Sequence, residues 1–380
     1  MAALLLTSMV WSGHAQEKNE MDLSGEWAFQ TDVMDFRRGS LDVRYCHRLQ
    51  ESIVLPGITD DYKIGYKSPY RHLDRLTRVY EYMGPAWYQR EIEIPAAWKG
   101  KRIFLYFERT HWLSSVYVGK EEVSKIDYIS IPHNHELTQW LHPGKKELIT
   151  FCIDNRYQYD THKWDHAHSE FTQINWNGVL GEIKLVAVDP VYVDDMQVYP
   201  DIKNKSIKVK MTVRNCTEHT ASGKISFHVT GKDYRLQKEV PVTVTDSITY
   251  IEEEMFLGKD IHLWNEFHPN LYTLDCKLTS SVEGQSYAHE KSTTFGMREV
   301  EAGEDRIILN GEPIHLRGTV ENAVFPKTGY APVDDASWER VLRILKEYGM
   351  NHMRFHSWCP PEAAFNVACL LYTSDAADEL

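Results

Sequence analysis

The sequence has few cysteines, no excess of positive charge and, after its first residues, no long hydrophobic run. Its 380 residues carry 42 lysines and arginines against 55 acidic side chains, a net charge of −13. This balance argues against nucleic acid or an anionic membrane surface as a partner. The spacing of the six cysteines matches neither a disulfide framework nor a metal site, although the sequence leaves open that two of them form a single disulfide bridge. They are Cys46, Cys152, Cys216, Cys276, Cys359 and Cys369.

The first residues have the pattern of a secretory signal peptide. An apolar run from Ala2 to Trp11 is too short to cross a bilayer, and Gly13 and Ala15 supply the small residues that precede a cleavage site. The chain turns polar at Gln16. We therefore expect residues 1–15 to be removed and the protein to be secreted or periplasmic.

The last twelve residues, 369–380, resemble translated sequencing adapter. The string Cys-Leu-Leu-Tyr-Thr-Ser-Asp-Ala-Ala-Asp-Glu is what a transposase adapter used for shotgun libraries encodes in one frame. Scars of this kind are set aside before reasoning about a fold. We expect the natural sequence to depart from this one after Ala368.

What is present is mostly strand-like. Segments of alternating apolar and polar residues are separated by turns rich in glycine and proline, and many short strands punctuated in this way predict β-sandwiches. In the first half they are 87–94, 102–107, 115–118 and 148–153. Beyond Asp189-Pro190 the alternation continues in 207–213, 224–229 and 240–244, over about the length of one immunoglobulin-like sandwich.

The pattern changes after Phe295. Residues 307–316 predict a hairpin with Asn310-Gly311 in a type I′ turn, and 314–319 predict a buried strand. A helix follows, with Trp338, Val341, Leu342 and Leu345 at helical spacing and Gly349 as its stop. Residues 350–355 form the next strand. Strand, helix and strand are the opening of a parallel α/β fold.

Six short motifs in order resemble glycoside hydrolase family 2, the family of β-galactosidases, β-glucuronidases and β-mannosidases. The resemblance covers essentially all of 21–368. Its sharpest piece is 349–361, which is similar to an Asn-x-x-Arg segment at the end of the second barrel strand. The commoner family pattern has histidine three residues after that arginine, where this chain has Ser357. The other pieces are 23–27, 55–57 with 87–90, 175–181, Trp264 with 269–272 and 295–298, and 309–311 with 316–318.

The resemblance implies an all-β jelly-roll sandwich, then an immunoglobulin-like β-sandwich, then the start of an α/β (TIM) barrel. The expected domains are 16–189, 190–297 and 298–368, the first of them sugar-binding-like. The implied activity is retaining hydrolysis of O-glycosidic bonds in oligo- or polysaccharides, β-galactosidase-like. A different class stays open, namely a non-catalytic carbohydrate-binding protein built from the two sandwiches.

Barrel loops that follow the strands form the active face of such enzymes. Arg354 is expected at a strand end, where a guanidinium can hold a carboxylate or sugar hydroxyls. The alternative is that Arg354 only anchors barrel carboxylates and that Trp358 is ordinary core. A loop of the first domain is the further candidate, because pockets favour domain interfaces. The substrate-binding candidates are Arg354, His356, Trp358, Glu321, Asn322, Asn175, Trp176 and Asn177, with Asp165 beside the last three.

Retaining hydrolysis needs two carboxylates about 5 Å apart, and the resemblance places both glutamates on later barrel strands. We therefore assign no catalytic residue, and neither Asn19-Glu20 nor Asn265-Glu266 is a candidate acid. Two histidine clusters, His133 with His135 and His162 with His166 and His168, read as polar loops more than as metal sites, since neither has a full ligand set. We expect no cofactor and no metal. The expected partner is a carbohydrate substrate, and the sequence leaves open whether the full-length protein forms a homo-oligomer.

Overall fold

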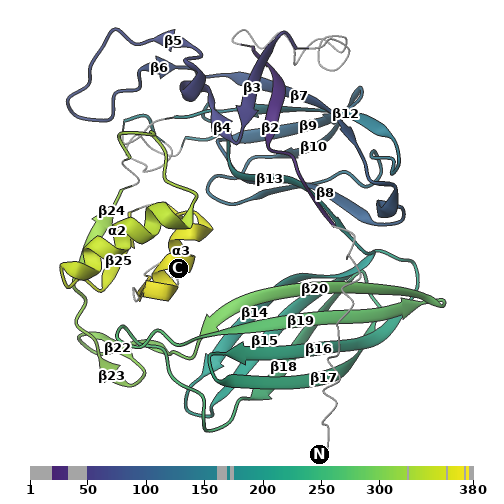
Figure 1. Cartoon of the computed structure of the whole chain (residues 1–380), viewed down its shortest axis with the longest axis vertical. Coiled ribbons are helices and arrows are strands. Elements are labelled where there is room, and N and C mark those ends of the chain that lie inside the picture. Colours follow the sequence, from purple (N-terminus) through teal and green to yellow (C-terminus); the bar gives the residue numbers. More distant parts are fainter. Residues whose placement is uncertain are drawn as a thin grey trace, which may run out of the picture.

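The computed structural model of the chain describes residues 19–32, 49–160, 169–171, 175–322, 325–356, 358–371 and 374–375. Figure 1 shows two β-rich parts, one above the other, and a smaller part with two helices that lies to one side of both. The helices are α2 (Asp335–Glu347) and α3 (Glu362–Leu371). Neither helix in this described part of the chain is long and apolar enough to cross a membrane.

The first β-rich part, called the first sandwich, consists of two antiparallel sheets. One sheet contains β1 (Glu20–Asp22), β4 (Gly57–Ile58), β8 (Arg102–Thr110), β11 (His133–Glu136) and β13 (Gly178–Val188). The other has the order β10-β9-β12-β7-β2-β3. Its strands are β2 (Gly25–Thr31), β3 (Glu51–Leu55), β7 (Pro85–Glu93), β9 (Leu113–Val118), β10 (Glu121–Ile126) and β12 (Lys146–Asp154). Short elements join them: η1 (Thr59–Tyr62), η2 (Ala96–Trp98) and the hairpin β5 (Tyr66–Lys67) with β6 (Tyr80–Glu81).

Aromatic side chains fill the space between these two sheets. The ring of Phe107 on β8 lies 4.8 Å from that of Phe151 on β12, which belongs to the opposite sheet, and Trp27 lies 5.0 Å from Phe151. Aromatic pairs at this separation add about 0.5–1.5 kcal/mol each beyond the area they bury. The four strands predicted here from alternation are confirmed as β7, β8, β9 and β12.

The second sandwich begins at Val191. A three-stranded sheet faces a four-stranded one in the order β17-β16-β19-β20, and apolar side chains of both sheets form one core. On β15 the alternation is regular, with Ile207, Val209, Met211 and Val213 all buried and the lysines between them exposed. The strands are β14 (Val191–Asp201), β15 (Ser206–Asn215), β16 (Ala221–Gly231), β17 (Tyr234–Val244), β18 (Ile248–Phe256), β19 (Leu271–Val282) and β20 (Gln285–Gly296).

A small antiparallel sheet leads out of the second sandwich. It consists of β21 (Val300–Ala302), β22 (Ile307–Leu309) and β23 (Glu312–Pro313). Between the last two strands, Asn310 has φ 52° and Gly311 has φ 84°. Both values are positive, as a type I′ turn requires, so the predicted hairpin is confirmed.

The parallel segment comes last in the chain. Its strands β24 (Gly318–Glu321), β25 (His352–Phe355) and β26 (Ser374–Asp375) pair in parallel, and α2 connects the first two. The Asp334 carboxylate caps α2 by accepting from the Ser337 N–H at 2.8 Å, and Trp338 and Leu342 are buried as the helical spacing predicted. Gly349 ends the turn after α2 with φ 75°.

The prediction of a buried strand over 314–319 is wrong in two respects. The strand begins only at Gly318, and its residues are exposed or half-buried, with the Val320 side chain 50% exposed. The apolar character of the segment suits a strand flanked on both sides, whereas β24 has β25 as its single neighbour among the described residues. The mostly β architecture agrees with the expected fold class. The jelly-roll, immunoglobulin and barrel assignments, and the boundaries at 189, 297 and 368, stay predictions.

Limited trypsin digestion should remove the parallel segment before it damages either sandwich. The segment's described core consists of seven buried side chains, and α2 and β24 present apolar residues such as Ile344 and Val320 to solvent. Regions with few buried apolar contacts open at low free-energy cost. Mass spectrometry should place early cuts between Arg298 and Lys346. Cleavage within β-strands of either sandwich while 298–346 stays intact would contradict this expectation.

Candidate functional site

The carboxyl ends of β24 and β25 meet at one edge of the parallel sheet. Glu321 is paired in register with Phe355, and the His356 N–H continues the ladder by donating to the Glu321 carbonyl at 2.9 Å. The Trp358 indole N–H donates to the same carbonyl, also at 2.9 Å. The structure therefore brings Glu321, His356 and Trp358 together, and their role as sugar contacts stays a prediction.

Arg354 lies on the open face of this sheet. Side chains alternate between faces along a strand, and the neighbours Met353 and Phe355 pack on the helix side, where Phe355 contacts Trp338 at 5.9 Å between ring centres. Arg354 is exposed, opposite Val320 in register. Its guanidinium is thus available to a carboxylate or to hydroxyls. Asn322 follows Glu321 directly and is half-buried at the same edge.

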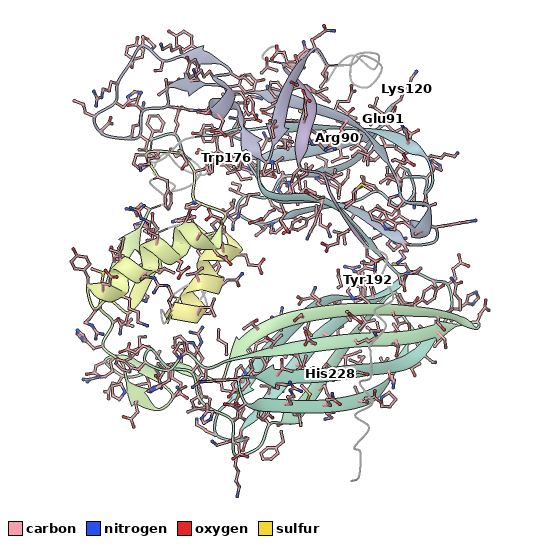
Figure 2. All side chains as sticks on the ribbon, in the orientation of Figure 1. Arg90, Glu91, Lys120, Trp176, Tyr192 and His228 are labelled. Atoms are coloured by element: carbon pink, nitrogen blue, oxygen red, sulfur yellow. The ribbon has the colours of Figure 1, made fainter. Side chains whose placement is uncertain are left out.

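A pocket separates this edge from the first sandwich. Its empty space is ≈ 570 Å³, a figure that includes open solvent, and the cavity within it measures ≈ 60 Å³. We call it the sandwich–strand pocket. Trp176 stands on one wall, with its ring 5.4 Å from that of His111, and Trp358 stands on another. Figure 2 shows Trp176 on the side of the first sandwich that faces α2 and α3.

Asn175 and Asn177 do not face this pocket, so their prediction as sugar contacts needs correction. The Asn175 amide donates to the Asn155 carbonyl at 2.8 Å, and the Asn177 amide donates to the Gly84 and Ile153 carbonyls at 2.9 and 3.0 Å. Both side chains are buried. They hold the loop to its neighbours and expose only Trp176, which lies between them. Asp165 lies outside the described residues.

Arg109 is a functional candidate that the sequence reading missed. From the end of β8 its guanidinium donates to the Cys359 carbonyl at 2.8 Å and to the Pro360 carbonyl. Burial lowers the pKa of this guanidinium from its ordinary value, while the nearby Cys359 and Glu108 oppose the shift. One signal was present in the sequence. Inward positions of β8 hold Ile103, Leu105 and Phe107, and Arg109 occupies the next position in that series.

A second junction lies at the opposite, amino-terminal end of the same strands. The Asn351 side chain accepts from the Arg317 N–H at 2.7 Å and donates to the His315 carbonyl and to the Glu266 carboxylate. Glu266 therefore serves as a hydrogen-bond acceptor on the side of the sheet away from Glu321. This placement agrees with setting Asn265-Glu266 aside as an acid. Glu20, of the other Asn-Glu pair, lies on the edge strand β1.

His133 and His135 lie on strand β11, so their prediction as loop residues is wrong. They belong to a buried chain of hydrogen bonds. The His133 Nε2–H donates to the Tyr128 carbonyl at 3.0 Å, which leaves Nδ1 to accept from the Ser114 hydroxyl at 2.6 Å. Ser114 in turn contacts His135 Nε2 at 2.8 Å, and the Ser124 hydroxyl donates to His135 Nδ1 at 2.8 Å.

The histidine chain is neutral in the folded protein. Burial lowers the pKa of His133, and burial together with His133 lowers the pKa of His135 to about 3. Within the ranges that the structure describes, no group of three or more His, Cys, Asp or Glu side chains could hold a metal ion. The second cluster, His162, His166 and His168, lies outside those ranges.

Comparisons with known proteins agree on one family. Residues 191–298 match the model of glycosyl hydrolases family 2. A β-galactosidase of Thermoanaerobacter pseudethanolicus is 24% identical over 76% of this chain and 38% of its own length, and a β-glucuronidase of Sus scrofa is 23% identical over 83% and 50%. A solved family 2 member from Bacteroides cellulosilyticus superposes with a TM-score of 0.73 at 19% identity, over 94% of this chain and 47% of its own. The chain thus spans about half the length of these relatives or less.

The buried histidines should make stability fall as the solution is acidified. The pKa of His135 is depressed from 6.5 in the unfolded chain to about 3 in the folded one, so below pH 6.5 the unfolded state binds the proton first. Between pH 7 and pH 5 one such group lowers the free energy of unfolding by about 2 kcal/mol.

Urea denaturation of the chain and of His135→Gln at pH 7 and pH 5 measures this contribution. The amide of glutamine can still bond to the serine hydroxyls but does not titrate, so the variant should lose about 2 kcal/mol less over this interval. The buried His289, whose pKa is lowered to about 4, is present in both proteins and cancels in the difference. Equal losses in the two proteins would contradict the assignment.

Proposed function

Because the chain belongs to glycosyl hydrolase family 2, we propose that it is the amino-terminal part of a secreted or periplasmic glycosidase. The proposed reaction is retaining hydrolysis of O-glycosidic bonds in oligo- or polysaccharides, β-galactosidase-like. The two sandwiches would be of the jelly-roll and immunoglobulin types, and the parallel segment would open the catalytic barrel. The observation that carries the proposal is the meeting of Glu321, His356 and Trp358 at the carboxyl edge of two parallel strands, since that edge is the active face of such barrels.

Each residue at this edge has a role that its surroundings support. Arg354 offers an exposed guanidinium to a sugar's hydroxyl or carboxylate oxygens. The indole N–H of Trp358 donates to the Glu321 carbonyl, and its ring stands perpendicular to that of Phe355 with the ring centres 5.3 Å apart. With its N–H engaged, the indole offers apolar ring surface, and the apolar C–H face of a pyranose would pack on it. His356 is held by its backbone and would donate to a hydroxyl from its side chain.

The covalent chemistry is assigned to glutamates outside the 380 residues. The support is that the chain spans 38–50% of its first relatives and that the family resemblance places both carboxylates on later strands. A retaining mechanism without nucleophile and acid has no route to the glycosyl-enzyme intermediate. The 380-residue chain by itself is therefore proposed to bind carbohydrate and to hydrolyse none.

Assays of the chain and of the complete protein test this proposal together. With 4-nitrophenyl β-D-galactoside and β-D-glucuronide, the complete protein should turn over at least one substrate with retention of configuration, and the chain should turn over neither. In the complete protein, Arg354→Ala should lower kcat/KM by roughly 10–100-fold, the equivalent of a charged hydrogen bond. Arg340→Ala, an exposed arginine on α2, is the matched control.

Three results would contradict the proposal. Turnover by the purified chain, with host enzymes excluded, would place the chemistry within these residues. An inactive complete protein that still binds glycans would favour a carbohydrate-binding protein. Equal kcat/KM in Arg354→Ala and Arg340→Ala would move the sugar site away from the edge of β24 and β25.

A further inference from the structure

The sandwich–strand pocket has walls of a different chemistry from the open face that carries Arg354. Apolar and aromatic side chains from three separate stretches of chain surround it. The first sandwich contributes two of these stretches and the loop before α2 contributes the third, while Trp358 closes the side next to β25. The apolar lining consists of Ile129, Trp176, Leu180, Tyr330, Val333 and Trp358.

Most polar groups in these walls are already bound within the protein. The Arg109 guanidinium donates hydrogen bonds to the carbonyls of Cys359 and Pro360. The Thr110 hydroxyl contacts His133 Nδ1 at 3.1 Å, and the Trp358 N–H is engaged with Glu321. Each of these groups would have to break an internal hydrogen bond before it could serve a ligand.

The remaining polar atoms are too few for a second sugar. A pyranose carries several hydroxyls, and burying one without a partner costs about 1–3 kcal/mol. In the described part of the walls, the side chains that show no hydrogen bond within the protein are the Ser130 and Tyr330 hydroxyls and the Trp176 indole N–H, and the His111 imidazole lies beside them. A flat apolar ring, by contrast, matches indole and aliphatic walls and asks for at most one hydrogen bond.

We propose that the sandwich–strand pocket binds the apolar, ring-shaped leaving group of a glycoside. Trp358 connects the two sites, because it borders this pocket while its N–H is fixed to the edge where the sugar is placed. The bond to be cleaved would then lie between the open face and the pocket. The inference rests on the proposed glycosidase function, but its test measures binding alone and needs no turnover.

The experiment titrates the 380-residue chain, labelled with 5-fluorotryptophan, with 4-methylphenol as the ring alone and with methyl β-D-glucopyranoside as the sugar alone. Fluorine NMR signals of Trp176, Trp358 and the distant Trp264 are assigned by single Trp→Phe variants. We expect 4-methylphenol to shift the Trp176 and Trp358 signals saturably and to leave Trp264 unmoved. The glucoside should not shift the Trp176 signal at the same concentration.

Variants of the pocket separate this site from general hydrophobic binding. Ala331→Phe should fill the pocket and weaken 4-methylphenol at least tenfold, whereas Ala97→Phe, on an exposed turn of the first sandwich, should change nothing. Val333→Thr keeps the shape, adds a hydroxyl and should weaken binding two- to fivefold, which covers the case that Ala331→Phe does not fold. Unmoved Trp176 and Trp358 signals, tighter binding of the glucoside, or full affinity in both pocket variants would overturn the proposal.

Discussion

The site depends on one interaction, the donation of two hydrogen bonds by Arg109 of the first sandwich to carbonyls just beyond β25. Hydrogen bonds from a charged donor are stronger than neutral ones, and this side chain is half-buried. The carbonyls belong to Cys359 and Pro360, directly after Trp358. Because these carbonyls are held in place, the position of Trp358 is restricted. The Trp358 indole N–H is in turn bonded to the Glu321 carbonyl at the end of β24. One side chain from a different part of the chain thereby organises both walls of the site.

The parallel strands are also held at their other end. Asn351, before β25, is bound to the segment before β24 and to Glu266 of the second sandwich. Nearby, the Asn310 amide donates to the Trp264 carbonyl at 2.8 Å, and Arg298 lies over the Trp264 ring at 5.0 Å. Each sandwich therefore holds one end of a short sheet whose own core is small. The candidate site lies at the carboxyl ends of β24 and β25, where the first sandwich contacts them, and the second sandwich supports their amino ends.

Local sequence patterns predicted the strands, the helix and the turn, whereas contacts between residues far apart in the sequence determine what individual side chains do. Alternation is enough to find β7 or β15, helical spacing finds α2, and Asn310-Gly311 finds its turn, because each rests on residues close together in sequence. Asn177 and Trp176 are neighbours with opposite roles, and only the packing of Gly84 and Ile153 around the asparagine makes that difference. Arg109 interacts with residues 250 positions away, so an interrupted alternation in β8 was its one trace in the sequence.

The most direct test of this account is hydrogen exchange of the His356 amide and the Trp358 indole N–H in Arg109→Met. The His356 N–H is bonded to Glu321 at 2.9 Å, and losing a charged hydrogen bond of about 1.5–3 kcal/mol should speed exchange there roughly 10–100-fold. Arg90→Met is the matched control, because Arg90 donates to the Leu23 carbonyl at 2.9 Å within the first sandwich alone. The account predicts faster exchange at His356 and Trp358 in Arg109→Met and unchanged exchange in Arg90→Met. Equal exchange at these two N–H groups in Arg109→Met and the unaltered chain would contradict it.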